Sequence, residues 1–213
     1  MPLQSPNPLM TQLDCAPIVP LIAEDDPGRA VEVALALKAG GLTVIEVVLR
    51  SEGALRCLEA ICKTDDALIV GAGTVITLES LSAARAAGAQ FIVSPGLLDA
   101  LVEQCLADEV PVLPGVMTPG ETQRAHAMGL GTVKFFPATL AGGVPMLCAL
   151  AAVFRDMRFM PTGGVSDRNL AEYLALQCVA ACGGSWLTPK GAEPAAIEAL
   201  AREALTIASA ARG

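Results

Sequence analysis

The chain has 213 residues, of which 53% are hydrophobic and only 17% are charged, and it carries a net charge of −8. This length allows one domain with a large core, and the composition is typical of a globular protein whose elements are mostly buried on both sides. The acidic balance and the absence of a basic run exclude nucleic acid and anionic membranes as partners, so any anionic ligand has to meet a few local cations.

The cysteine pattern, the first ten residues and the hydropathy of the run 135–154 indicate a cytoplasmic protein. Seven cysteines are scattered without a CxxC pair, which fits reduced thiols in the core. The first ten residues, MPLQSPNPLM, lack the basic and apolar regions of a secretory signal, and prolines and glycines interrupt the uncharged run 135–154 before it could span a membrane. His126 is the only histidine, so we expect no histidine-based metal site and no Ser-His-Asp triad within one chain.

Strand-like and helix-like segments alternate along the chain, after a short N-terminal helix expected at Pro8–Cys15. The expected strands are Pro17–Ala23, Thr43–Leu49, Ala67–Gly71, Gln90–Val93, Val110–Leu113, Thr132–Phe136, Met157–Met160 and Cys178–Cys182. The expected helices are Asp25–Ala39, Glu52–Lys63, Leu78–Ala87, Leu98–Ala107, Pro119–Met128, Val144–Phe154, Asp167–Leu176 and Pro194–Ala210.

This alternation predicts an α/β fold with parallel strands and right-handed crossovers. Eight such units that close on themselves predict a single-domain (β/α)8 TIM barrel over residues 1–213. A doubly wound open sheet is the alternative. It usually has fewer strands and a glycine-rich turn after the first one, where this chain reads AEDD.

One lysine, Lys134, lies inside a predicted strand, in the run TVKFFPA at 132–138. Burial of an ammonium group is costly unless the group is paired or loses its proton, and a desolvated neutral lysine can attack a carbonyl to form a Schiff base. In the alternative, Lys134 ends an edge strand and its ammonium group reaches water. The other three lysines, Lys38, Lys63 and Lys190, lie at helix ends or in a loop and need no such role.

The second strand carries two charged residues on one face. Side chains alternate along a strand, so Glu46 and Arg50 share the face opposite the aliphatic residues between them. We therefore expect Glu46, Arg50 and Lys134 to converge inside the barrel. A Glu–Arg pair that only holds the strand ends is the alternative, although polar groups inside a barrel more often serve a site.

Small residues follow several of the predicted strands. Glycine pairs occur in PTGGVS at 161–166 and CGGSWL at 182–187, each before a serine and a helix-like segment. Loops after strands seven and eight are the usual phosphate cradle of a barrel, because glycine lets the backbone N–H groups approach an anion. Thr74, after the third strand, can donate its hydroxyl to a small carboxylate or cap the next helix.

Six segments of the chain, taken together and in order, resemble motifs of the bacterial KDPG/KHG aldolases. They are EVVLR (46–50), GAGTV (71–75), SPG (94–96), KFFPA (134–138), PTGG (161–164) and GGSWL (183–187). The members of this family are class I aldolases that act on 2-keto-3-deoxy-6-phosphogluconate and 4-hydroxy-2-oxoglutarate. The resemblance implies a homotrimer of (β/α)8 barrels that acts on a phosphorylated keto acid, with no metal and no organic cofactor.

The resemblance also implies roles for individual residues. Lys134 matches the Schiff-base lysine, and Glu46 matches the general acid and base. Arg50 and Thr74, with the region of Pro95, match the positions that bind the pyruvate carboxylate. The positions that match the distal, phosphate-binding loops are Thr162, Gly163, Gly164, Gly184 and Ser185.

Two departures and two alternatives accompany this resemblance. Val48 and Ser51 stand where threonines are common in the family, and Arg50 favours the gluconate-type branch because galactonate-type relatives carry asparagine there. The first alternative function is a phosphate-handling barrel isomerase or epimerase, which would not need a lysine inside a strand. The second is a non-enzymatic binder of sugar-acid phosphates, in which Lys134 is only a charge partner.

Overall fold

The computed structural model describes residues 16–212, so the helix expected at Pro8–Cys15 lies outside the described residues. The strands are β1 (Ile18–Ile22), β2 (Val44–Val48), β3 (Ile69–Gly73), β4 (Phe91–Val93), β5 (Val112–Leu113), β6 (Gly115–Val116), β7 (Thr132–Phe135), β8 (Arg158–Pro161) and β9 (Cys182–Gly184). The helices are α2 (Pro27–Ala39), α3 (Ala54–Cys62), α4 (Leu78–Ala86), α5 (Asp99–Ala107), α6 (Pro119–Ala127), α7 (Gly143–Val153), α8 (Leu170–Leu174) and α9 (Pro194–Arg212).

The strands form two parallel sheets, which gives the α/β fold expected from the alternation. One sheet has the order β5-β4-β3-β2-β1-β9, and the other has the order β6-β7-β8. The predicted fifth strand, Val110–Leu113, corresponds to β5, and an additional strand, β6, follows beyond Pro114, which has no N–H group to donate to a ladder. Isolated bridges join the segments of β8 and β9, from Phe159 to Val179 and from Thr162 to Gly183.

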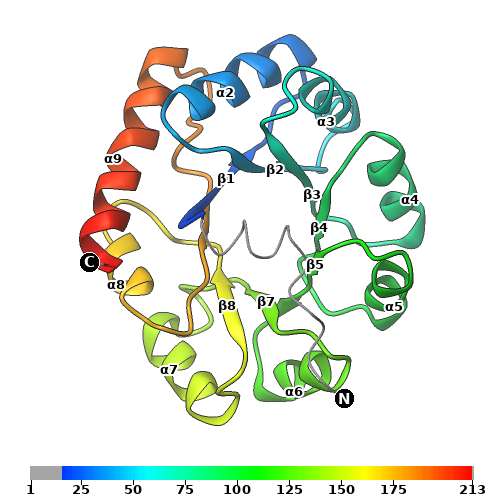
Figure 1. The fold of residues 1–213 in the computed structure, drawn as a ribbon, viewed down its shortest axis with the longest axis vertical. Coiled ribbons are helices and arrows are strands. Elements are labelled where there is room, and N and C mark those ends of the chain that lie inside the picture. Colours follow the sequence, from blue (N-terminus) through cyan, green and yellow to red (C-terminus); the bar gives the residue numbers. More distant parts are fainter. Residues whose placement is uncertain (1–15, 213) are drawn as a thin grey trace.

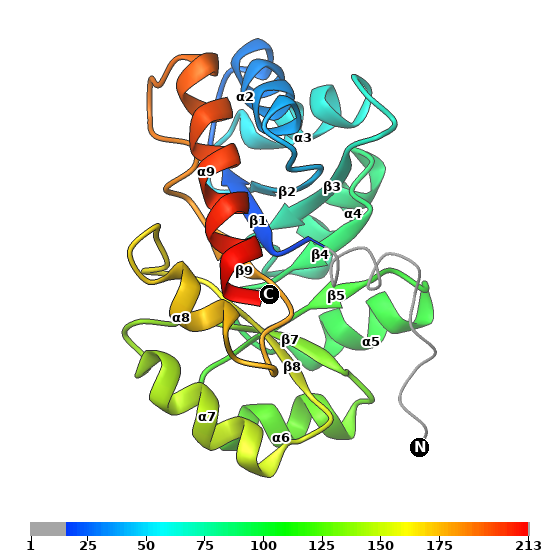
Figure 2. The same cartoon turned by 60° about the vertical axis from the view of Figure 1, so that its left-hand side comes forward.

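The helices lie outside the curved strands and follow one another in chain order (Figure 1). Helix α9 contacts both α8 and α2, so the last helix meets the first described one (Figure 2). Local sequence explains where several helices begin. Asp26 caps α2 through the N–H of Arg29, and Thr77 and Thr118 form capping boxes at the starts of α4 and α6.

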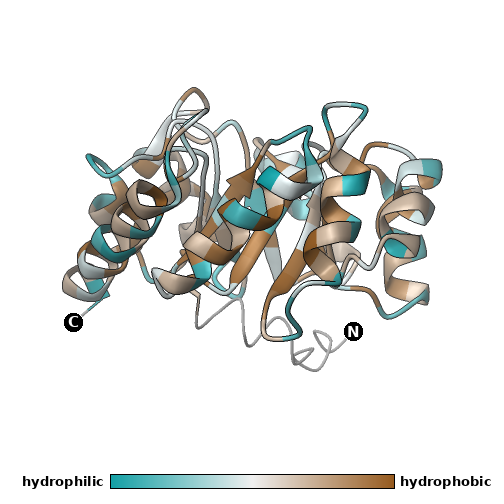
Figure 3. Ribbon diagram, turned by 90° about the horizontal axis from the view of Figure 1, so that it is seen from above, coloured by the Kyte–Doolittle hydropathy of each residue, from teal (hydrophilic) through white to brown (hydrophobic). Residues whose placement is uncertain are grey.

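The buried apolar residues form two separate clusters. The larger one fills the space between strands and helices. The smaller one lies on the opposite faces of the strands and consists of Val19, Val44, Phe91, Val93, Leu113, Met160 and Ala181. The strands are accordingly mainly hydrophobic, and hydrophilic residues gather on the helices and loops (Figure 3).

Three predicted elements, two strands and one helix, differ most from the structure in their bounds. The third strand is Ile69–Gly73 and not Ala67–Gly71, because Asp65 bonds the N–H groups of the next residues in a turn. The last strand is Cys182–Gly184 and not Cys178–Cys182, because these three residues pair with β1.

The helix expected at Asp167–Leu176 covers only Leu170–Leu174. The residues before it form a turn, in which Asn169 bonds the preceding loop. Among residues 16–212, no helix is long and apolar enough to cross a membrane.

Candidate active site

Lys134 and Glu46 meet in the interior. Lys134 lies on β7 between Val133 and Phe135, which both belong to the helix-facing cluster, so the lysine faces the other way. Its side chain is only 5% exposed and that of Glu46 only 1%, and Lys134 Nζ lies 3.5 Å from Glu46 Oε1. Because β7 is the middle strand of its sheet, Lys134 is not at an edge strand with its ammonium group in water.

The surroundings of this pair leave one carboxylate oxygen unsatisfied. Within the described part of the chain, Glu46 Oε2 is buried and has no hydrogen-bond partner. Buried polar atoms in this state are rare, and at an active site they mark the place of a ligand or water. Gly73 makes room for the carboxylate, since a Cβ atom built there would lie 2.0 Å from Glu46 Oε1. The ring centroid of Phe136 lies 5.3 Å from Lys134 Nζ, within cation–π distance.

Arg50 follows the end of β2 and does not pair with Glu46. Its Nε donates to Thr74 Oγ1 at 3.3 Å, and its side chain is exposed. Thr74 has a φ of 63°, in the left-handed region that is uncommon for residues other than glycine and is frequent at functional sites. The capping role considered for Thr74 belongs instead to Thr77, and the Thr74 hydroxyl accepts the hydrogen bond of Arg50.

The backbone of Pro95 lies close to the strand next to Lys134. A Cβ atom on Gly115 would lie 2.1 Å from the Pro95 carbonyl oxygen, so only glycine fits between them. Gly115 is in turn the register partner of Lys134. The structure therefore places Pro95, Lys134 and Glu46 around the same interior.

The two glycine pairs lie side by side. Thr162 is buried and forms a β-bridge with Gly183. A Cβ atom on Gly183 would lie 2.3 Å from Thr162 Oγ1, so only glycine fits at this position. Gly163 and Gly164 have φ values of 93° and 81°, which glycine adopts without strain. A helix follows each pair further along the chain, α8 from Leu170 and α9 from Pro194, the second at the predicted residue.

Gly184 ends β9, and Ser185 follows it on the surface. A Cβ atom on Gly184 would overlap the ring of Trp186, so this position is restricted to glycine by packing. The loop after Ser185 is fixed to the end of β1, since Thr188 Oγ1 donates to the Leu21 carbonyl at 2.6 Å. Ser185 and the first glycine pair thus belong to the same face of the molecule.

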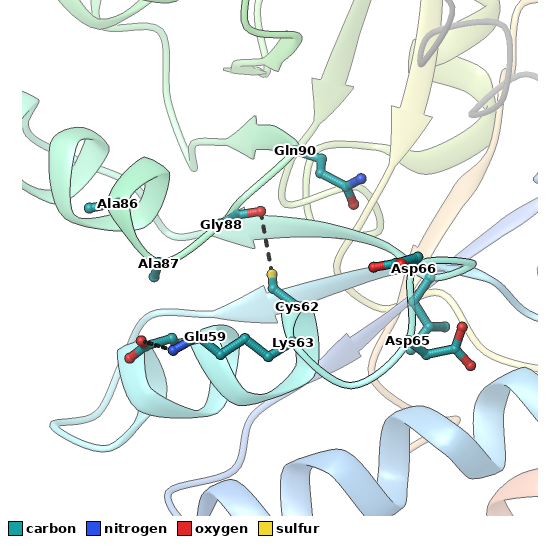
Figure 4. Close-up of a pocket in the computed structure, with 10 residues that line it drawn as sticks. Glu59, Cys62, Lys63, Asp65, Asp66, Ala86, Ala87, Gly88 and Gln90 are labelled. Atoms are coloured by element: carbon teal, nitrogen blue, oxygen red, sulfur yellow. Dashed lines mark hydrogen bonds and ion pairs between the residues drawn. The ribbon is translucent and has the colours of Figure 1, made fainter.

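A pocket of about 440 Å³ lies elsewhere, at the N-terminal ends of β3 and β4 (Figure 4). It is lined by Cys62 and by acidic side chains, of which Asp65 has its pKa lowered by its hydrogen bond with Lys38. Burial raises the pKa of the Cys62 thiol to about 11, and the thiol donates to the Gly88 carbonyl. A protonated thiol is a poor nucleophile, so this pocket does not offer the chemistry that Lys134 and Glu46 offer.

The chain matches the sequence model of the KDPG and KHG aldolase family over residues 9–200. A 2-dehydro-3-deoxy-phosphogluconate aldolase of Treponema pallidum is 44% identical over 81% of this chain and 82% of its own length. A KHG/KDPG aldolase of Escherichia coli is 44% identical over 91% of this chain and 92% of its own length.

Solved structures agree with these relatives. The 2-keto-3-deoxy-6-phosphogluconate aldolase of Zymomonas mobilis, crystallised with 3-phosphoglycerate, superposes with a TM-score of 0.90 at 39% identity over 94% of this chain and 96% of its own. A KDPG aldolase of Legionella pneumophila superposes with a TM-score of 0.87 at 40% identity over 89% of this chain and 94% of its own. In that structure, pyruvate was captured at low pH as a covalent carbinolamine intermediate.

Proposed function

The chain belongs to the KDPG and KHG aldolase family, and we propose that its Lys134 forms the Schiff base through which it cleaves 2-keto-3-deoxy-6-phosphogluconate to pyruvate and glyceraldehyde 3-phosphate. One observation carries the proposal: a buried lysine lies 3.5 Å from a buried glutamate that has a free carboxylate oxygen. The same pyruvate half occurs in 4-hydroxy-2-oxoglutarate, so cleavage of that compound to pyruvate and glyoxylate is a second activity of the same site.

The first half of the reaction builds an electron sink. The neutral amine of Lys134 attacks the C2 ketone of the substrate, and loss of water gives a protonated imine. The Glu46 carboxylate takes the proton of the C4 hydroxyl, the C3–C4 bond breaks, and its electron pair moves toward the imine nitrogen. The aldehyde leaves, and an enamine of pyruvate remains on Lys134.

The second half returns the proton and frees the product. Glu46, now a carboxylic acid, gives its proton to C3 of the enamine, which restores the imine. Water then hydrolyses the imine to pyruvate and the free lysine. One carboxyl group does both transfers, which suits a side chain that is held against Lys134 and has one oxygen without a hydrogen-bond partner among the described residues.

Cations and N–H groups around the pair bind the two anionic ends of the substrate. Arg50 and Thr74 bind the pyruvate carboxylate, with the backbone near Pro95 beside them; their mutual hydrogen bond supports this assignment. The phosphate lies against the paired glycine loops, whose contributing residues are Thr162, Gly163, Gly164, Gly184 and Ser185. No metal or organic cofactor enters these steps.

The proposal extends to the whole fold and its assembly. The two parallel sheets together form a closed single-domain (β/α)8 barrel, supported by the bridges between the segments of β8 and β9 and by the contact of α9 with α2.

The chain assembles as a homotrimer in the cytoplasm. Exposed apolar side chains between the ends of β3, β4 and β6 and the starts of the helices that follow support a subunit contact; they are Ile76, Leu78, Leu98 and Met117.

The proposed activity is tested by incubating the purified protein with 2-keto-3-deoxy-6-phosphogluconate and following pyruvate with lactate dehydrogenase. We expect steady pyruvate release. An isomerase or epimerase, or a protein that only binds the compound, would consume or hold the substrate without forming pyruvate.

Replacing Gly73 by alanine is expected to lower turnover about 10- to 100-fold. The new methyl group would overlap Glu46 Oε1 and push the carboxylate away from Lys134, and misplaced catalytic groups lose activity on this scale. Turnover and the melting temperature should be measured together. Gly131→Ala is the matched control, because a Cβ atom there meets nothing within 4 Å. Wild-type turnover in a folded Gly73→Ala protein would contradict the assigned packing.

A further inference from the structure

We propose that Asn169 is a positioning residue for the phosphate end of the substrate, holding the Gly163–Gly164 pair so that the next backbone N–H groups face the anion. The inference rests on the proposed aldolase function and adds to it a residue outside the motifs. Asn169 precedes α8, five residues beyond Gly164.

The loop after β8 is a glycine turn that carries backbone N–H groups an anion can meet. Gly163 and Gly164 are two successive residues with positive φ, 93° and 81°. Turns of this kind direct successive N–H groups into one concavity. In the part of the chain that the structure describes, the N–H groups of Gly164 and Val165 donate to no acceptor. Gly164 is exposed, but Val165 is buried. An unpaired backbone donor at a buried residue is rare, and a bound anion would satisfy it together with the neighbouring Gly164 N–H.

Three successive carbonyl groups of the same loop accept hydrogen bonds. The Thr162 and Gly163 oxygens accept hydrogen bonds from the N–H groups of Ala138 and Thr139, at 2.8 and 3.0 Å. Both donors belong to the loop that follows Lys134, so this loop is fixed to the catalytic strand. The third oxygen, that of Gly164, accepts from Asn169 Nδ2 at 2.9 Å, its one donor among residues 16–212.

Because the peptide unit is planar, the bond from Asn169 to the Gly164 carbonyl also fixes the direction of the next N–H group. In a planar trans peptide, the C=O of one residue and the N–H of the next point in opposite directions. Asn169 draws the Gly164 carbonyl toward itself, and the Val165 N–H therefore points away from Asn169. The bond from the Thr139 N–H to the Gly163 carbonyl does the same for the Gly164 N–H.

Asn169 is not simply the cap of the helix that follows it. An N-cap side chain accepts a hydrogen bond from the first turn of its own helix, and Asn169 makes no such bond with α8. Its Oδ1 atom instead accepts the N–H of Ser166 at 2.8 Å, while its Nδ2 atom donates to Gly164. Both polar atoms of the Asn169 amide thus bond the segment Gly164–Ser166, which carries the proposed phosphate contacts.

The test compares a phosphorylated and a phosphate-free substrate. For Asn169→Ala, we expect kcat/KM for 2-keto-3-deoxy-6-phosphogluconate to fall about 10- to 100-fold, mainly through KM, because the N–H groups that meet a charged phosphate lose their orientation. For 4-hydroxy-2-oxoglutarate, which has no phosphate, the change should stay below about threefold. The yield of the borohydride-trapped pyruvate adduct should be unchanged.

Two further variants keep the inference open to refutation. Asn169→Ser retains a residue favoured at the start of a helix, but its side chain is too short to hold Gly164. It should therefore show the same selective loss as Asn169→Ala; a loss in the alanine variant alone would indicate a disturbed start of α8 and contradict the inference. Thr118→Val, which removes the capping box of α6, is the matched control for loss of a helix cap and should affect both substrates alike.

An equal loss on both substrates, or no loss on either, would overturn the role of Asn169 and leave the aldolase assignment in place. A wild-type protein that releases pyruvate from neither substrate would instead refute the proposed function itself.

Discussion

Replacing Lys134 by methionine is expected to abolish aldol cleavage and to lower turnover by at least about 10⁴-fold. Most of the rate enhancement of an enzyme that works through a covalent intermediate is lost when its nucleophile is removed. Methionine is close to lysine in length and has no amine, so neither the imine nor the electron sink can form. The buried carboxylate of Glu46 would lose its partner at the same time, a change that destabilises proteins by about 3–5 kcal/mol.

A second variant separates the loss of chemistry from the loss of the ion pair. Lys134→Arg keeps a cation beside Glu46, but the guanidinium group stays protonated and cannot form a Schiff base. This variant should be as inactive as Lys134→Met and should unfold at a higher temperature than Lys134→Met. Pyruvate release and thermal unfolding are the measurements. Lys63→Met, at an exposed lysine paired with Glu59, is the control and should keep wild-type turnover. Cleavage at the wild-type rate by a folded Lys134→Met protein would rule out the proposed nucleophile.

Replacing Glu46 by glutamine is expected to lower turnover about 10²- to 10⁴-fold while imine formation is kept in part, since proton transfer by a placed side chain contributes on this scale. The amide has nearly the shape of the carboxylate but can neither take the proton of the C4 hydroxyl nor return one to C3. The imine needs only Lys134 and the ketone, so a reduced pyruvyl adduct should still form, more slowly.

Single-turnover and steady-state measurements on the Glu46→Gln variant separate the two steps. Glu103→Gln, on the exposed side of α5, is the matched control for the change of charge. Unchanged turnover in Glu46→Gln would refute its assigned role as general acid and base. A complete loss of the trapped adduct would show that Glu46 is needed earlier, for the attack of the amine.

The position of Lys134 could be predicted from the sequence because local pattern and burial agree there. A single lysine between Val133 and Phe135 has to face opposite to them on any strand, and Glu46 follows the same alternation on β2. The alternation of strands and helices likewise predicted the parallel sheets. The expected convergence of Glu46 and Lys134 is what the structure shows.

The partner of Arg50 could not be predicted, because the alternation holds only within a strand. β2 ends at Val48, so the chain beyond it turns, and Arg50 bonds Thr74 and not Glu46. The boundaries of β3 were missed for a related reason. Glycines usually indicate a turn, and the predicted strand ended at Gly71, but Gly73 also lies within the strand because the Glu46 carboxylate occupies the space of its missing side chain.

Three contributors to the site depend on tertiary contacts and were missed in the sequence. Gly73 matters only through the space it leaves for Glu46, and Phe136 through the distance of its ring from Lys134 Nζ. Asn169 had a weak local signal, since an asparagine three residues after Ser166 often bonds the backbone of a turn. Only the structure shows that this turn carries the glycine pair.

The most direct test of the account is borohydride reduction in the presence of pyruvate, followed by peptide mapping. We expect one reduced pyruvyl adduct, on the peptide that contains Lys134. No adduct in folded protein, or an adduct confined to Lys38, Lys63 or Lys190, would contradict a Schiff-base mechanism at Lys134.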